Sequence, residues 1–262
     1  MLRKISGKGL KTIAITDHDT INGYLKACEL IEEQKIDLEI ISGVELTALW
    51  EDREVHILAY DFDSENSEFL ALIAHQKLAR RQRMKEIVGL LNRQGVDVEY
   101  DEIRAVAGNG NLGRPHAAAV LIKKGVVSSI PEAFIRYLAT DKLDGIKTNY
   151  MQLSDIIDIV KLAGGVLSVA HPGPIYSSDE LEKLISCGLD GIECIHPSHN
   201  FNVQRNYTRM AKSKNLLITG GSDYHGSNRS EYDPYLGVVT ISQEHVDSLR
   251  RTAETRKRIK TR

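Results

Sequence analysis

Residues that could bind a metal ion gather at the ends of strand-like segments in this sequence. Asp17, His18 and Asp19 directly follow the apolar run KTIAIT. The same placement recurs further on, where Glu45 follows LEIISGV, His56 lies within EVHILAY, His171 follows GVLSVA, His196 follows GIECI, and Asp223 and His225 follow LLITGGS. In a barrel of parallel strands the carboxyl ends meet at one face, where active sites lie. The pattern therefore predicts that these side chains converge.

The residue types indicate which ions such a site would take. Imidazole and carboxylate ligands together suit Zn, Mn or Fe. The cysteines, Cys28, Cys187 and Cys194, show no C-x-x-C spacing, which favours a catalytic over a structural metal site. A single buried histidine or turn aspartate is structural more often than not. Burying the whole set without a cation would cost several kcal/mol, so the set favours metal binding.

The segments that must position these residues alternate between strand and helix. Runs of β-branched residues bounded by Gly, Pro, Asp or Asn predict strands at KTIAIT, LEIIS, EVHILAY, GVLSVA, GIECI, LLITG and LGVVTI. Helices are predicted between several of them, and one of these helices starts with a capping box at Ser177 and Glu180. This alternation predicts an α/β fold with a parallel sheet or barrel.

The alternation is interrupted between about residues 66 and 150, where helical periodicity dominates. Met84, Ile87, Val88 and Leu91 follow the i, i+3, i+4, i+7 rule of a helix with one apolar face. We therefore expect three parts: an α/β scaffold made of residues 1–65 and 151–250, a small helical insertion domain at 66–150, and a basic C-terminal tail at 251–262.

Composition excludes several classes of protein. A chain of 262 residues can bury a sizeable core, and 42% apolar and 27% charged residues are ordinary for a soluble globular protein. The net charge of −2 gives the whole molecule no strong attraction to nucleic acid, so the basic runs at 80–85 and 250–262 are expected to be a solvated helix face and a frayed end. No apolar run is long enough for a membrane span or a signal peptide. The odd number of cysteines fits a reducing, cytoplasmic location.

Six motifs, which occur in this order, carry a more specific signal: AITDHDT, SGVELT, REVHILAY, VAHPG, GIECIHPSH and GGSDYHG. Together they resemble consecutive motifs of the PHP (polymerase and histidinol phosphatase) family of metal-dependent phosphoesterases, and they cover almost the whole chain. The resemblance implies a distorted (β/α)7 TIM-like barrel and a cluster of up to three divalent ions, Mn or alternatively Fe or Zn. It also implies hydrolysis of phosphate esters by a metal-bound hydroxide.

The resemblance assigns metal ligands as well. The implied ligands, grouped by metal position, are Glu45, His56 and His171 for the first, Glu45 and Asp223 for the second, and His18 and His225 for the third. Asp17 is expected either to orient an imidazole or simply to form the turn. His196 and His199 are expected either to line the pocket or to be structural.

The inserted segment NLGRPHAAAVLIKKGVVSSIPEAFIRYLA narrows the resemblance. It is similar to the insertion of a PHP subgroup that contains 3′,5′-nucleotide bisphosphate phosphatases and a 5′-3′ exoribonuclease. This similarity implies that Arg114 and His116 bind a substrate phosphate, although an arginine before a proline is, by itself, usually a surface residue. The implied substrates are 3′,5′-bisphosphonucleotides or 5′-phosphorylated ends of short RNAs. Histidinol phosphate is a weaker alternative, because the insertion does not resemble that branch.

The family's first strand, which ends in His-x-His and is followed by Ser-Asp-Gly, has no counterpart in this sequence. Met1 falls where the family's first helix is expected, and among the metal positions only the one assigned to Glu45, His56 and His171 keeps its expected ligands. We expect a misassigned start or a fragment. The alternative is a degenerate protein that binds metal and a phosphorylated ligand without turnover. No protein partner is indicated.

Overall fold

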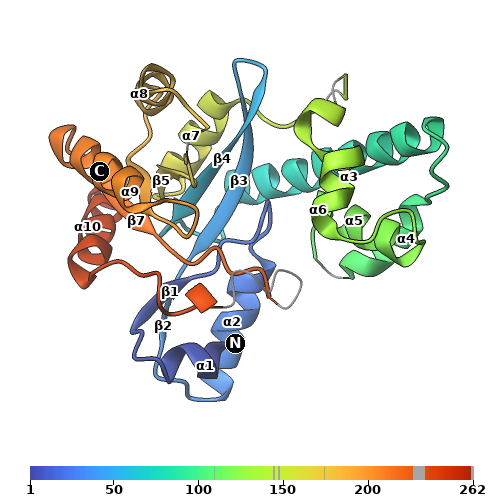
Figure 1. Cartoon of the computed structure of the whole chain (residues 1–262). Coiled ribbons are helices and arrows are strands. Elements are labelled where there is room, and N and C mark those ends of the chain that lie inside the picture. The colour runs from blue at the N-terminus through green and yellow to red at the C-terminus, as the bar shows by residue number, and fades with distance from the viewer. Residues whose placement is uncertain (109, 144, 147, 174, 227–233, 261–262) are drawn as a thin grey trace. The chain divides into compact units, whose positions relative to one another are not determined.

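The computed structural model describes residues 1–260 except 109, 144, 147, 174 and 227–233. The chain divides into two compact units, which are described separately (Figure 1). Unit 1 contains Met1–Ile73 and Met151–Arg262, and unit 2 contains Ala74–Tyr150. No helix in the described part of the chain combines the length and the apolar character that crossing a bilayer requires.

The strands of unit 1 form two sheets. β1 (Thr12–Ala14) and β2 (Glu39–Ile41) pair in parallel. The other sheet has the order β3 (Gly43–Trp50), β4 (Arg53–Tyr60), β5 (Val166–Val169), β6 (Gly191–Ile195) and β7 (Leu217–Gly220). Within it β4 is antiparallel to both β3 and β5, whereas β5, β6 and β7 are parallel. The unit is therefore a mixed α/β structure.

The expected parallel arrangement is wrong for β3 and β4, and the turn between them explains why. Trp50 pairs with Arg53, so only Glu51 and Asp52 connect the strands. Both residues have positive φ, 48° and 61°, as in the type I′ turn of a two-residue hairpin. Strands joined by so short a turn must be antiparallel, because a parallel crossover needs a dozen or more residues.

Two further strand predictions need correction. The run LEIISGV does not end before Glu45; it breaks at Ser42, and Glu45 lies inside a second, eight-residue strand. The run LGVVTI, predicted as a strand, forms a turn instead. Gly237 has φ +73° there, and the Val238 side chain is 66% exposed, so this apolar run does not enter the sheet. The other six predicted strands are confirmed at their centres.

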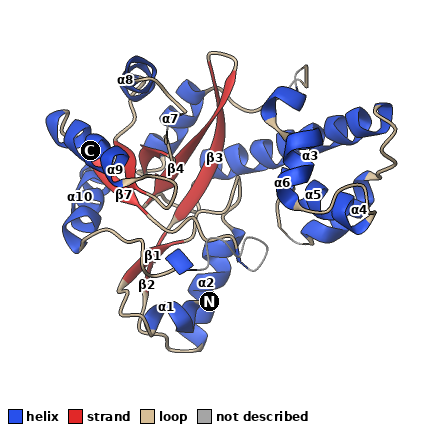
Figure 2. Ribbon diagram, viewed as in Figure 1, coloured by secondary structure: helices blue, strands red, loops and turns tan. Residues whose placement is uncertain are grey.

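Helices flank the strands of unit 1 (Figure 2). They are α1 (Leu2–Ser6), α2 (Asn22–Glu33), α7 (Leu153–Leu162), α8 (Ser178–Ser186), α9 (Phe201–Ser213) and α10 (Gln243–Lys260). The capping box at the start of α8 is confirmed: Ser177 Oγ accepts from the backbone N–H of Glu180 at 3.2 Å, and Glu180 Oε2 accepts from that of Ser177 at 2.9 Å. α9 packs on β6 and β7, and α10 packs on β5 and β7.

A partly buried ion pair attaches α10 to the sheet. The Arg256 guanidinium donates to both carboxylate oxygens of Asp190, at 2.7 and 3.1 Å, and also to the carbonyl of Gly165. Asp190 precedes β6, and its carboxylate accepts a third hydrogen bond from the backbone N–H of Leu167 on β5. A bidentate pair of this kind fixes both position and orientation, so it joins α10 to two adjacent strands.

Unit 2 is helical and has its own apolar core. Its elements are the part of α3 (Ser67–Arg93) that follows Ile73, α4 (Tyr100–Ala107), α5 (Arg114–Lys123), α6 (Ile130–Ala133), a π-helical turn (Phe134–Leu138) and a 3₁₀ turn (Thr140–Leu143). The predicted apolar stripe of Met84, Ile87, Val88 and Leu91 is buried in this core, as the helical spacing requires.

Candidate metal centre

The centre is built around Glu45, whose carboxylate is almost entirely buried. Glu45 lies on β3, and the antiparallel register pairs it with Leu58 and pairs Thr47 with His56. Glu45 and His56 are therefore diagonal neighbours on one face of the sheet. His56 Nδ1 lies 2.9 Å from Glu45 Oε1. The short hairpin between β3 and β4 thus creates the first contact of the centre.

His171 reaches the same carboxylate from β5. The backbone N–H of Ala170 donates to the carbonyl of His56 at 3.1 Å, which places the next residue beside His56. His171 Nε2 lies 3.0 Å from Glu45 Oε1 and 3.4 Å from His56 Nδ1. Its φ is +26°, a region that is costly for a residue other than glycine, so tertiary contacts hold this backbone in place.

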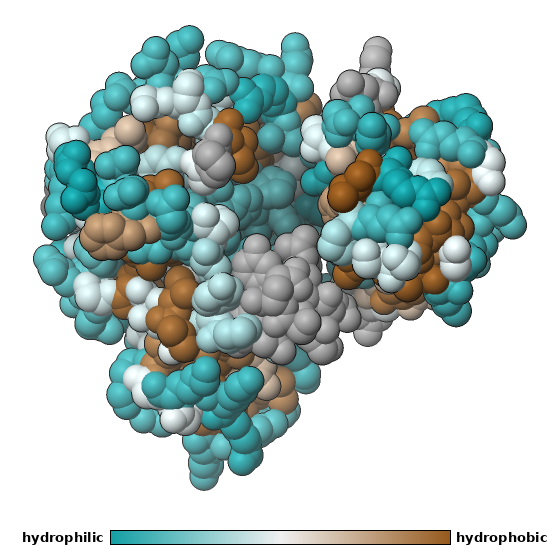
Figure 3. Space-filling view, in the orientation of Figure 1, coloured by the Kyte–Doolittle hydropathy of each residue, from teal (hydrophilic) through white to brown (hydrophobic). Residues whose placement is uncertain are grey.

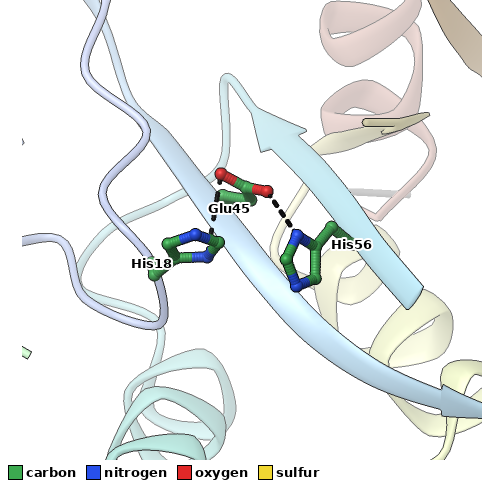
Figure 4. Close-up of side chains that lie close together, drawn as sticks. All are labelled: His18, Glu45 and His56. Carbon is green, nitrogen blue, oxygen red and sulfur yellow. Dashed lines mark ion pairs between the residues drawn. The ribbon is translucent and has the colours of Figure 1, made fainter. Parts of the chain in front are cut away.

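His18 approaches the other carboxylate oxygen from the loop after β1. A parallel β-bridge joins His18 to Glu45, and His18 Nδ1 lies 3.7 Å from Glu45 Oε2. In Figure 4, one carboxylate oxygen of Glu45 points to the imidazole of His18, and the other points to the imidazole of His56. The centroids of these two rings are 4.8 Å apart. The structure thus brings His18 beside the ligands implied for the first metal position.

Asp19 holds that loop against β3. It is fully buried, and its carboxylate accepts from the backbone N–H of Thr47 at 2.8 Å and from the Thr47 hydroxyl at 3.0 Å. Asp17 packs so closely against Gly23 that a Cβ there would lie 2.0 Å from Asp17 Oδ2. Burial raises the pKa of Asp17, and His225 partly opposes this.

The charges of the centre are strongly coupled. Burial alone would raise the pKa of Glu45, but His18, His171 and His56 outweigh it and hold that pKa well below its usual range. Burial likewise lowers the pKa of His171, yet the hydrogen bond to Glu45 and the nearby carboxylates raise it to about 9. The Glu45 carboxylate and the His171 imidazole therefore each favour the charged form of the other.

A second group of donors surrounds Asp223, which follows β7 with φ +48°. His196 Nε2 lies 3.5 Å from Asp223 Oδ2, and His225 Nδ1 lies 3.5 Å from Asp223 Oδ1. The rings of His171 and His196 are 5.6 Å apart, so the two groups adjoin each other. Of the two predicted pocket histidines, His196 is thus within the centre.

His199 has a structural role. Its Nε2 accepts from the backbone N–H of Gly173 at 3.0 Å, and its Nδ1 lies 3.1 Å from the carbonyl of Cys194. Both ring nitrogens are therefore engaged in holding the loop after β5 to β6. The side chain is 3% exposed, as is that of His196.

The sequence pattern does not single out Glu193, which belongs to the centre. Its carboxylate accepts from the backbone N–H of His171 at 2.6 Å and is 6% exposed. Burial raises its pKa to about 7, although His196 and His171 act in the opposite direction. The one available signal was a carboxylate in the middle of the apolar strand GIECI. Charged residues are rarely fully buried without partners.

Arg114 and His116, expected to bind phosphate, lie in unit 2 at the start of α5. Arg114 Nη1 donates to the carbonyl of Leu138 at 3.2 Å, and its guanidinium lies 5.5 Å from the centre of the Phe134 ring. His116 Nδ1 accepts from the backbone N–H of Gly113 at 3.0 Å, and burial lowers its pKa. Their role toward phosphate stays a prediction.

The donor set of unit 1 fits a divalent ion. The possible ligand atoms of His18, Glu45 and His56 lie within 4.8 Å of one another, little more than twice a metal–ligand bond of about 2.1 Å. Glu45 is ionised, and the side chains of His18, His56 and His171 remain 31%, 27% and 28% exposed. An ion can therefore reach a preformed set of nitrogen and oxygen donors.

The chain resembles several known proteins over most of its length, although no family model matches it. It is 32% identical to a 5′-3′ exoribonuclease of Haemophilus influenzae over 86% of this chain and 83% of that protein. It is 32% identical to a phosphoribosyl 1,2-cyclic phosphate 1,2-diphosphodiesterase of Eggerthella lenta, over 86% and 87%. Identity to a 3′,5′-nucleoside bisphosphate phosphatase of Chromobacterium violaceum is 26%, over 84% and 79%.

A solved structure agrees with these relatives. A protein of Bifidobacterium adolescentis, classed provisionally as a metal-dependent phosphoesterase, is 32% identical and matches with a TM-score of 0.80. The match covers 96% of this chain and 91% of that one. The fold and the His- and Glu-lined centre thus define a metal-dependent phosphoesterase. More narrowly, the chain belongs to the PHP family of these enzymes.

Proposed function

We propose that the protein hydrolyses phosphate esters of nucleotides, acting on 3′,5′-bisphosphonucleotides or on the 5′-phosphorylated ends of short RNAs. The observation that carries this proposal is the convergence of three imidazoles on the buried carboxylate of Glu45. Relatives with this family's chemistry include a 5′-3′ exoribonuclease and a nucleoside bisphosphate phosphatase. The first name describes cleavage of RNA from its 5′ end, and the second describes removal of phosphate from a nucleoside bisphosphate.

The proposed metal ligands are His18, Glu45, His56, His171, Asp223 and His225. Divalent ions bound there, which we propose to be Mn, would supply positive charge to the phosphate oxygens and make a water molecule more acidic. Glu45 presents one oxygen to His18 and the other to His56 and His171, so each oxygen would be available to a different ion. Glu193 holds the backbone of His171 and so orients its imidazole.

The remaining parts of the proposal concern architecture and substrate binding. We propose that the strands of unit 1 belong to a distorted (β/α)7 barrel, with residues 66–150 inserted as a helical domain. Arg114 and His116 would bind a substrate phosphate, for which the planar guanidinium is suited. The free thiols of Cys28, Cys187 and Cys194 support a reducing, cytoplasmic location.

A second candidate function is hydrolysis of a cyclic phosphodiester. The relative from Eggerthella lenta, a cyclic phosphate diphosphodiesterase, matches this chain at 32% identity, as the Haemophilus exoribonuclease does. The same donor set serves either reaction, because both require charge neutralisation on phosphate oxygens and attack by water. The two functions differ in the ester that the site accepts.

The test is a substrate panel assayed with Mn and after EDTA treatment. The panel contains adenosine 3′,5′-bisphosphate, 5′-phosphorylated RNA, a 1,2-cyclic phosphoribose and histidinol phosphate. We expect Mn-dependent release of phosphate or mononucleotide from the first two. His171→Ala should abolish it, whereas His245→Ala, which alters a histidine outside the centre, should retain wild-type rates. One bound metal ion with no turnover of any substrate would overturn the proposal and support the degenerate alternative.

A further inference from the structure

A groove on α9 lies outside the metal centre and has no role in the function proposed above. It has a volume of about 430 Å³. Its lining residues are Ile195, Phe201, Gln204, Arg205, Thr208, Arg209 and Lys212. Except for Ile195, all come from one face of α9, since they recur at spacings of three and four residues.

The groove is basic and lacks opposing acids. Arg205, Arg209 and Lys212 are exposed, and among the described residues no carboxylate forms an ion pair with any of the three. The sequence from Cys194 to Ser222 contains no Asp or Glu, although the whole chain has more acidic than basic residues. Figure 3 shows hydrophilic and apolar residues side by side on the surface where α9 lies. The positive charge of this face is therefore available to a polyanion.

The aromatic ring at the start of α9 points to the kind of polyanion. Phe201 lines this basic groove, and its side chain is 73% exposed. Surfaces that bind single-stranded nucleic acid combine a positive groove, which follows the sugar-phosphate chain, with exposed aromatic rings on which bases stack. An acidic peptide would use the cations but would leave the ring without a stacking partner.

The groove and the metal centre each include a residue at the carboxyl end of β6. Ile195 lines the groove, and the next residue, His196, lies against Asp223 in the centre. Gln204 Nε2 donates to the carbonyl of His199 at 2.9 Å, and the His199 ring lies 5.3 Å from the ring of His196. Adjacent residues at the carboxyl end of β6 therefore belong to the two sites.

We propose that the α9 groove binds single-stranded RNA, holding the nucleotides that follow the 5′ end placed at the metal centre. This inference rests on the proposed function, since the groove extends the same substrate beyond the scissile ester. Arg205, Arg209 and Lys212 lie along about 10 Å of helix, from the rise of 1.5 Å per residue. They contact successive phosphates, and Phe201 stacks on a base.

The test measures RNA binding in the absence of turnover. A 5′-phosphorylated, 3′-fluorescein-labelled eight-nucleotide RNA is titrated with the full chain in EDTA at several salt concentrations, with fluorescence anisotropy as the readout. The groove variant carries Arg205→Gln, Arg209→Gln and Lys212→Gln. The control variant carries Lys4→Gln, Lys35→Gln and Lys183→Gln, three exposed lysines elsewhere in unit 1, so both lose the same charge.

We expect the groove variant to bind RNA at least tenfold more weakly than the wild type. The slope of its plot of log K against log salt concentration should become less steep by about 2, because each phosphate contact contributes about 0.7. Phe201→Ala should weaken binding at least about fivefold with an unchanged salt slope. The control variant should bind like the wild type. Single substitutions Arg205→Gln and Lys212→Gln, each lowering the slope by about 0.7, supply the same test if the triple variant unfolds.

Equal losses in the groove and control variants would overturn the proposal, as would displacement of the RNA by polyglutamate at an equal concentration of negative charge. The binding assay needs no metal and no hydrolysis, so its result is independent of the activity panel. A wild-type protein that binds RNA through α9 but hydrolyses nothing would refute the proposed function and retain this inference. If the wild type is active and the groove variant binds RNA as tightly as the wild type, the proposed function is retained and this inference is refuted.

Discussion

Glu45→Gln should change how the stability of the metal-free protein depends on pH. In the wild type, Glu45 is a main reason why the pKa of His171 rises from its ordinary 6.5 to about 9. Because the pKa of His171 is higher in the folded than in the unfolded protein, the protonated imidazole stabilises the fold. This contribution is complete below pH 6.5 and is lost as the pH rises through about 9. A difference of about 2.5 in pKa corresponds to about 3 kcal/mol.

The assay is urea unfolding of EDTA-treated protein between pH 6 and 9.5. Between pH 6 and 9.5 the free energy of unfolding should fall in both proteins. The fall should be larger in the wild type than in Glu45→Gln by up to about 3 kcal/mol. Glu193 and Asp223 stay in the variant, so a smaller part of the dependence remains. Glu65→Gln, which alters an exposed carboxylate of unit 1, should behave like the wild type.

The same protonated imidazole gives a second readout. Histidine binds metal only as neutral imidazole, so Mn binding to the wild type at pH 7.5 should release about one proton from His171. Calorimetry in buffers of different ionisation enthalpy measures that proton directly. If wild-type stability is flat from pH 6.5 to 9, and metal binding releases no proton, the coupling of Glu45 to His171 described above is incorrect.

Three other perturbations test the frame around the centre. Arg256→Met should lower the free energy of unfolding by about 2 to 3 kcal/mol, because it leaves the carboxylate of Asp190, which is 13% exposed, without its charged partner. Chemical denaturation measures this loss. A loss below about 0.5 kcal/mol would contradict the prediction. Ser177→Ala should cost about 1 kcal/mol by removing the cap of α8, with Ser186→Ala at the other end of the helix as the matched control. In the folded protein Cys187, which is exposed, should react with iodoacetamide within minutes, whereas Cys194 should react only on unfolding, since burial raises its pKa to about 12. Peptide mapping distinguishes them, and early labelling of Cys194 would show that β6 opens readily.

Local patterns in the sequence determine much of this protein. The capping box at Ser177 and Glu180, the apolar stripe of α3 and six of the seven predicted strands are all present, because each depends on residues within a few positions of one another. Two corrections concern β3, namely its antiparallel pairing with β4 and the break that separates it from β2. Both have local causes that the sequence indicates only in part. The Glu51-Asp52 turn lacks the glycine that usually marks a type I′ hairpin, so the antiparallel pairing of β3 with β4 gave a weak signal.

The sequence also supplied the chemistry of the centre, since acids and imidazoles after apolar runs can be recognised without coordinates. Which of them meet was decided only by tertiary structure. His18, Glu45 and His171 are far apart in the chain, and long-range contacts bring His18 Nδ1 to 3.7 Å and His171 Nε2 to 3.0 Å from the Glu45 carboxylate. Tertiary structure likewise places Glu193 against the backbone of His171, and it places the His199 ring between Gly173 and Cys194. Register and strand order arise from long-range packing, and no window of neighbouring residues contains that information.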